Sequence, residues 1–191
     1  MTSTWTGDHE SKPAPGRLRL VQAFVNTLDR ESGQDRLAQV ADAARWLIDN
    51  GLLGPDAEPD PDDLQTAAGV REALRALIVQ NTGGPVPGAE VLTPLRRIAA
   101  ERRAVADVAG DGRVHLAPDG ESVPARLLNL LLIIGEAQTD GTWANLKACA
   151  NEDCRWAFYD RSRNHGGTWC EMATCGNKLK NREFRARRKG D

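Results

Sequence analysis

Four cysteines are the residues of this 191-residue sequence whose type and spacing point most directly to chemistry. They form two Cys-x4-Cys pairs separated by fifteen residues, and no other cysteine is present. Thiolates from two close pairs, joined by a hairpin-sized spacer, can complete the tetrahedral shell of a zinc ion. This pattern is more typical of a metal site than of ordinary buried thiols, and no Cys-x-x-Cys redox motif occurs. We therefore predict that one structural Zn²⁺ is bound by Cys149, Cys154, Cys170 and Cys175, a closed shell with no open position for a catalytic water.

The spacing within each pair limits the backbone that can hold it. Positions five apart differ by about 140° in a helix, and they lie on opposite faces of a strand. Each pair must therefore lie on a turn, and Gly176 suits a tight backbone there. The β-prone segment 155–160 and the turn at 161–167 predict a hairpin between the pairs. Four aromatic side chains could shield the metal: Trp156, Phe158, Tyr159 and Trp169.

The charge is divided unevenly along the chain. Residues 147–191 hold eleven Lys/Arg and six Asp/Glu, a net charge of +5, whereas the remainder carries −7. We expect a final helix capped by Asn177, with one basic face formed by Lys178, Arg182, Arg185 and Lys189. Such a face favours phosphate binding over the alternative of a merely solvated basic helix. Arg161 and Arg163 on the hairpin are further candidates for contacts with nucleic acid.

The chain before the cysteines is expected to be mainly helical. Apolar residues recur at helical spacing over residues 17–30, 35–50, 90–100 and 122–138. A further helix, the third along the chain, is expected to begin at a cap formed by Asp60. Short β runs at 105–108 and 113–116 flank Gly-Asp-Gly, a strong hairpin turn. The predicted fold is thus mainly α with a small β-hairpin (α+β). We divide it into a disordered tail (1–16), a helical domain (17–140) and a C-terminal four-cysteine zinc finger of hairpin plus helix (143–191).

Several function classes find no support in the sequence. The most apolar stretch, 127–134, is far shorter than the roughly 20 residues of a bilayer span, and residues 1–16 are too polar for a signal peptide. We therefore expect no membrane association and a cytoplasmic protein, in which thiols stay reduced. The three histidines form no recognisable catalytic set, and Asn26 with Thr27 is the one hint of a polar site. We accordingly predict a protein that is not an enzyme.

Residues 143–189 resemble the CGNR zinc finger. The resemblance is carried by the two cysteine pairs, the aromatic strand, Asp160-Arg161-Ser162, Trp169-Cys170 and the basic tail. The motif that names the finger reads Cys175-Gly176-Asn177-Lys178 in this sequence. A lysine thus replaces the final arginine, which keeps the charge but removes bidentate recognition. Upstream, Phe24-Val25-Asn26-Thr27-Leu28, followed by Ala44-Arg45-Trp46-Leu47, resembles the ABATE-type domain that accompanies this finger.

The resemblance implies a bacterial transcription regulator linked to stress. We therefore expect a DNA-binding regulator whose finger contacts double-stranded DNA. Its helical domain would sense a small-molecule effector, form a homodimer or recruit a protein partner. The alternative is a zinc-dependent module that binds RNA or another protein.

Overall fold

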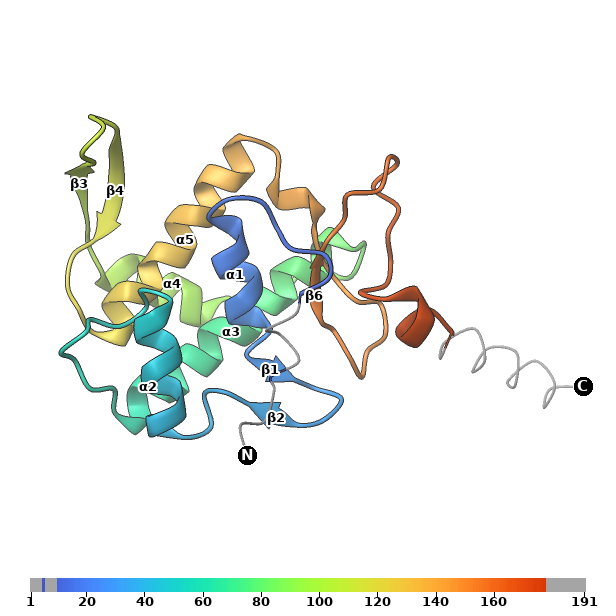
Figure 1. Cartoon of the computed structure of the whole chain (residues 1–191), viewed down its shortest axis with the longest axis horizontal. Coiled ribbons are helices and arrows are strands. Elements are labelled where there is room, and N and C mark those ends of the chain that lie inside the picture. The colour runs from blue at the N-terminus through green and yellow to red at the C-terminus, as the bar shows by residue number, and fades with distance from the viewer. Residues whose placement is uncertain (1–4, 6–9, 178–191) are drawn as a thin grey trace, which may run out of the picture.

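Helix α3 (Pro61–Asn81) is the element against which most of the protein packs. The computed structural model describes residue 5 and residues 10–177, and in this part of the chain four further α-helices contact α3 (Figure 1). These helices are α1 (Leu18–Val25), α2 (Val40–Asp49), α4 (Thr93–Glu101) and α5 (Val123–Thr139). Buried side chains occur along α3 from Leu64 to Ile78, because its neighbours cover several of its faces. None of the described helices has the length and apolar character needed to cross a membrane.

The start of α3 confirms the cap predicted from the sequence. The Asp60 carboxylate accepts the Asp63 N–H at 2.8 Å, and the Asp63 carboxylate accepts the Asp60 N–H at 3.3 Å. This reciprocal capping satisfies two backbone donors, and Pro61 lies in the first turn, where its missing N–H is not needed. The helices expected over 17–30 and 35–50 are shorter in the structure, because residues 28–29 and 34–35 form strands instead.

Three antiparallel strand pairs complete the described fold. They are β1 (Leu28–Asp29) with β2 (Gln34–Asp35), β3 (Ala104–Val108) with β4 (Val114–Pro118), and β5 (Leu146–Ala148) with β6 (Ala157–Tyr159). The second pair is the hairpin predicted around Gly-Asp-Gly, and Gly112 adopts the left-handed conformation there with a φ of +83°. This hairpin projects from the helical body at the end opposite β6 (Figure 1).

The β5–β6 hairpin shares one hydrophobic core with the helices. Its buried side chains in that core are Leu146, Ala148, Ala157 and Tyr159. The Thr82 hydroxyl, just after α3, accepts the Ala148 N–H at 2.9 Å and donates to the Ala148 carbonyl at 3.0 Å. The core is therefore continuous across residues 138–142, where the sequence analysis places a domain boundary. We call β5, β6 and their contacts with the helices the stem of the finger.

Residues 10–16 lie along the stem, whereas the sequence predicts a disordered tail over 1–16. The Tyr159 N–H donates to the Lys12 carbonyl at 2.9 Å, and the Lys12 ammonium donates to the Trp169 carbonyl at 2.8 Å. Ala14 is buried, and its N–H donates to the Gln22 side chain at 2.6 Å. Polar composition predicted disorder here, but order comes from backbone hydrogen bonds that composition does not reveal. Residues 1–4 and 6–9 lie outside the described part.

Candidate metal centre and its surroundings

The four cysteine sulfurs converge on one point. All four lie within 4.8 Å of one another. The Cys154 and Cys170 sulfurs are 3.8 Å apart, and those of Cys170 and Cys175 are 3.7 Å apart. A zinc ion with four sulfur ligands at about 2.3 Å in a regular tetrahedron requires sulfurs about 3.8 Å apart. A disulfide would need about 2.05 Å. The thiols are free of disulfides, and the donor set and its spacing fit zinc.

Each cysteine pair lies on a turn, as the five-residue spacing predicts. Cys149 directly follows β5 and Cys154 closes the turn that leads to β6, so the first pair occupies the loop of the β5–β6 hairpin. The Cys149 N–H donates to the Trp156 carbonyl at 2.9 Å and holds this loop shut. Arg155 adopts a left-handed φ of +49°, which turns the chain back into β6.

The second pair brackets the start of a short π-helical turn, η3 (Met172–Gly176). Cys170 precedes the turn and Cys175 lies within it. Gly176 leaves room for its neighbours: a Cβ there would force the Met172 side chain to move and would approach the Trp169 ring to 3.3 Å. The two turns, from segments sixteen residues or more apart, are what bring the four thiols together.

The strand that carries the aromatic residues pairs differently from our prediction. We expected residues 155–160 to form a hairpin with the segment just before Cys170. In the structure β6 pairs with β5 instead, and the returning segment contributes the Thr168 carbonyl, which accepts the Ala150 N–H at 2.9 Å. The reason is packing: β5 places buried side chains in the helical core, which the returning segment does not.

Two of the four aromatic residues predicted to shield the metal do so. Trp156 and Trp169 pack against the buried cysteines. Tyr159 points into the helical core, and the buried Phe158 ring lies under the Lys12 ammonium, 4.9 Å from its centroid. The sequence could not show which aromatic side chains face the metal and which face the helical core. That depends on the strand with which β6 pairs, and β5 was not predicted to be that strand.

Hydrogen bonding among the thiols affects their protonation. Contacts with Cys154 and Cys170 lower the pKa of Cys149, while the same contacts with Cys149 raise the pKa of Cys154 and Cys170. One thiolate is thus stabilised at the expense of its neighbours. A divalent cation removes this conflict by stabilising all four thiolates together, and its binding releases protons.

A buried ion pair fixes the loop that follows β6. The Lys147 ammonium of β5 lies 2.8 Å from the Asp160 carboxylate and also donates to the His165 carbonyl. Asp160 further accepts the N–H groups of Ser162 at 2.9 Å and Gly167 at 2.7 Å. Burial alone would raise the pKa of Asp160, but these hydrogen bonds outweigh it and hold that pKa well below its ordinary value. A Cβ at Gly167 would meet this carboxylate at 2.8 Å, so glycine permits the close approach.

Replacing Asp160 with asparagine should destabilise the protein by about 3 kcal/mol, because Lys147 would keep a buried charge without its partner. The pKa of Asp160 is lowered in the folded state, so its contribution is fully present above the unfolded value of about 3.9 and is lost progressively as the pH falls from there through the folded-state pKa. The wild-type and D160N proteins should therefore differ equally at pH 7 and pH 5.5, begin to converge only below about pH 4, and converge fully only as the pH falls through the lowered folded-state pKa of Asp160. Denaturant titration of both proteins measures this difference.

Asp111 provides the matched control for that measurement, because it is an exposed aspartate paired with Arg113 at a hairpin tip. Its change to asparagine should leave the denaturation midpoint unchanged. A D160N protein as stable as the wild type at pH 7 would show that the ion pair does not fix the loop.

Two buried carboxamides attach the finger to α1. Asn26 accepts the Ala157 N–H at 2.8 Å and donates to the Ala157 carbonyl at 2.9 Å, as a neighbouring strand would. Gln22 donates to the same carbonyl at 3.1 Å. Arg75 of α3 adds bonds to the carbonyls of Val25 at 2.8 Å and Arg155 at 3.0 Å. The sequence offers Asn26 with Thr27 as the one hint of a polar site, and the structure shows that Asn26 attaches the finger to the end of α1.

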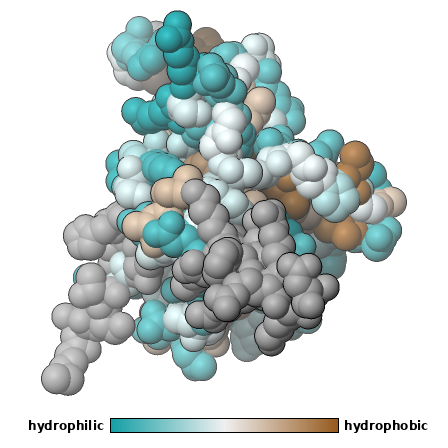
Figure 2. All heavy atoms as spheres, turned by 90° about the vertical axis from the view of Figure 1, so that its right-hand side faces the viewer, coloured by the Kyte–Doolittle hydropathy of each residue, from teal (hydrophilic) through white to brown (hydrophobic). Residues whose placement is uncertain are grey.

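The basic residues predicted to contact nucleic acid fall into two groups. Lys178, Arg182, Arg185 and Lys189, together with the final helix, lie outside the described residues. Arg161 and Arg163 lie on the exposed loop that Asp160 fixes, and Arg161 donates to the Pro13 carbonyl at 2.9 Å. Figure 2 shows the side of the molecule that carries the finger. The described surface there is mainly hydrophilic, with apolar side chains gathered towards one edge.

The fold and the four-sulfur cluster define a zinc-finger protein with a helical domain, and comparison with known families agrees. Residues 145–188 match the CGNR zinc finger. Residues 18–139, more than half of the chain, match the family described as "putative stress-induced transcription regulator", ABATE. The chain therefore belongs to the ABATE family and carries a CGNR finger with a structural zinc site. A search of curated proteins finds no match.

Proposed function

We propose that this protein is a transcription regulator that binds double-stranded DNA through its finger. The observation that supports this most directly is the position of the Arg161–Arg163 loop. A buried ion pair fixes it within the finger that also carries the four-cysteine centre, in a chain of a regulator family. Guanidinium groups on a fixed loop can contact phosphates without first being ordered. The basic residues from Lys178 to Lys189 extend the positive charge along the chain.

In this proposal the two parts of the chain have different tasks. Zinc holds the finger in shape and takes no part in a reaction, since four thiolates close its coordination shell. Phosphate contacts from the basic residues supply affinity and register. The helical part receives the signal, from an effector, a second copy of the chain or another protein. The setting is the bacterial cytoplasm, where thiols remain reduced and available to zinc.

Salt dependence tests the basic face quantitatively. If Lys178, Arg182, Arg185 and Lys189 each neutralise one phosphate, log affinity for random duplex DNA should fall with log salt at a slope of about −3.6. Changing Arg182 and Arg185 to glutamate should weaken binding to all sequences and flatten the slope by about two units. Fluorescence anisotropy at several salt concentrations measures both effects.

The control double variant changes Arg97 and Arg113 to glutamate, which alters the charge equally at exposed sites on α4 and on the β3–β4 hairpin. Binding and slope should then be nearly unchanged. A loss confined to variants of Arg161 and Arg163 would place DNA on the loop and not on the predicted helix. Binding of RNA alone, or of neither nucleic acid, would contradict the proposal and favour the alternative module.

A further inference from the structure

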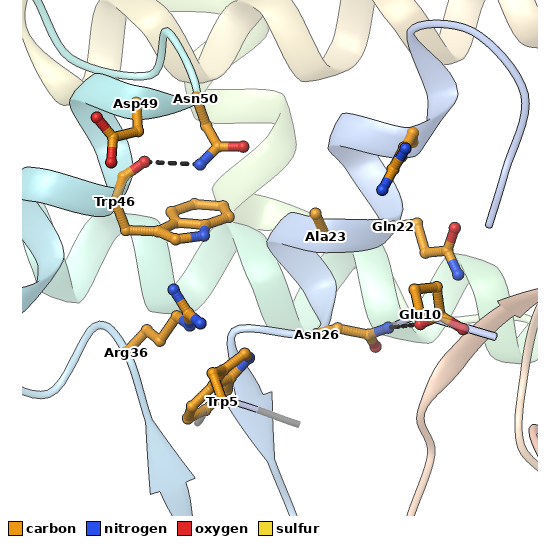
Figure 3. A pocket seen from close by; sticks show the side chains of 10 residues that line it. Trp5, Glu10, Gln22, Ala23, Asn26, Arg36, Trp46, Asp49 and Asn50 are labelled. Carbon is orange, nitrogen blue, oxygen red and sulfur yellow. Dashed lines mark hydrogen bonds between the residues drawn. The ribbon is translucent and has the colours of Figure 1, made fainter. Parts of the chain in front are cut away.

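A cavity of about 380 Å³ lies between α1 and α2 (Figure 3). The first wall consists of Arg19, Gln22 and Ala23 of α1, with Asn26 directly after the helix, and their spacing of i, i+3, i+4 and i+7 places them on one face. The facing wall is formed by Trp46 and Asp49 of α2 with Asn50 directly after it, and the lining is completed by Trp5, Glu10 and Arg36. The volume lies in the lower part of the range for small-molecule pockets, about 300–1,000 Å³.

The walls of this cavity are suited to a flat molecule. In Figure 3 Trp46, Arg36 and Trp5 follow one another along one side, while Gln22, Asn26 and Glu10 lie on the other. The Arg36 guanidinium lies 4.7 Å from the centroid of the Trp5 ring. Ala23 lies between the two sides and its small side chain leaves the space open (Figure 3). Indole faces stack on planar groups, so the shape favours a single aromatic ring system.

The charges of the cavity favour a ligand with a carboxylate. Glu10 accepts the Trp156 indole N–H at 2.8 Å and the Asn26 amide at 3.2 Å. Asp49 lies 4.0 Å from Arg45. Arg19 is exposed, and its side chain forms no hydrogen bond or ion pair with the residues that the structure describes; only its backbone N–H donates, to the Gly16 carbonyl. Its guanidinium is thus available, and its planar fork matches a carboxylate.

We propose that this cavity is an effector site for a small aromatic carboxylate, stacked on Trp46 and paired with Arg19, and that the finger senses its occupancy. Three lining residues bond to the finger directly, and one of them, Gln22, donates to the Ala157 carbonyl. Glu10 holds the indole of Trp156, which packs on the cysteines, and Asn26 holds both backbone groups of Ala157 in β6. A ligand that moves either residue therefore acts on the stem and on the metal centre. The regulatory consequence rests on the proposed function, whereas binding itself does not.

The test titrates benzoate and indole-3-carboxylate into the zinc-loaded full-length protein by calorimetry, with benzamide as the uncharged probe. We expect the carboxylates to bind and benzamide to bind more weakly. R19Q should weaken the carboxylates at least tenfold and leave benzamide unchanged. A23L, which fills the cavity without altering charge, should weaken all three probes. R113Q, which removes an exposed arginine from the β3–β4 turn, should bind like the wild type.

The connection to the finger is read from the indole N–H resonances in the same titration. The signal of Trp156 should shift with occupancy, while that of Trp143, buried in the core away from the cavity, should not. Failure of both carboxylates to bind, or R19Q binding them as tightly as the wild type, would overturn the site. If the probes bind but the Trp156 indole N–H resonance does not shift, the inference that the finger senses occupancy of the cavity would be overturned. If the probes bind and shift Trp156 in a protein that does not bind DNA, the inference stands and the proposed function fails.

Discussion

Changing Cys154 to serine should release zinc and unfold the loops that hold the cysteines, while the stem and the helices keep their structure. The apparent free energy of zinc binding in zinc-finger peptides is about 10–16 kcal/mol, larger than the stability of so small a unit. Outside β6, the apolar packing described between Cys149 and Gly176 is that of Trp156 and Trp169 against the cysteines. Without the metal these loops have little apolar surface to bury.

Three measurements distinguish the loss of the loops from general unfolding. Metal analysis should give one zinc per chain in the wild type and none in C154S. Near-ultraviolet circular dichroism should lose the signal of Trp156 and Trp169, whereas the helical far-ultraviolet signal should remain. The exposed Thr174, next to Cys175, gives the control T174A, which should keep its zinc. Full zinc retention in single serine variants of all four cysteines would contradict the metal assignment.

The elements that local chemistry determines were predictable from the sequence. The cap at Asp60, the Gly-Asp-Gly hairpin and the turns around the cysteines depend on neighbouring residues, and the structure places all three where the spacing indicates. The zinc ligands were predictable for the same reason, because the spacing of cysteines within each pair indicates a metal site from a few neighbouring residues.

Pairings between distant segments could not be predicted in this way. Strand β5 is three residues long and carries no β signal of its own, so the aromatic strand appeared to pair with the segment after it. The roles of Gln22 and Asn26 depend on the Ala157 backbone more than 130 residues away. One signal was present: the carboxamides of Gln22 in α1 and of Asn26 directly after it lie one turn apart among apolar residues, and such groups must find partners when buried.

Ending the chain at Gly141 should unfold or strongly destabilise the helical part, although the family boundary falls close to that point. The truncation removes the buried side chains of the stem from the shared core. It also removes partners of Asn26, Arg75 and Thr82. Each large apolar side chain lost from a core costs about 2–5 kcal/mol, and a domain of this size has about 5–15 kcal/mol in all. We expect a loss of at least about 5 kcal/mol, measured by denaturant titration.

A second truncation, ending at Arg161, separates the stem from the metal centre. It keeps β5, β6 and the Lys147–Asp160 ion pair, but it removes Cys170 and Cys175 and therefore cannot complete the zinc site. This fragment should bind no structural zinc and yet unfold cooperatively with most of the stability of the helical body. If the fragment ending at Gly141 proved as stable as the one ending at Arg161, the stem would contribute nothing to the core. Residues 17–140 would then be the independent domain that the sequence suggests.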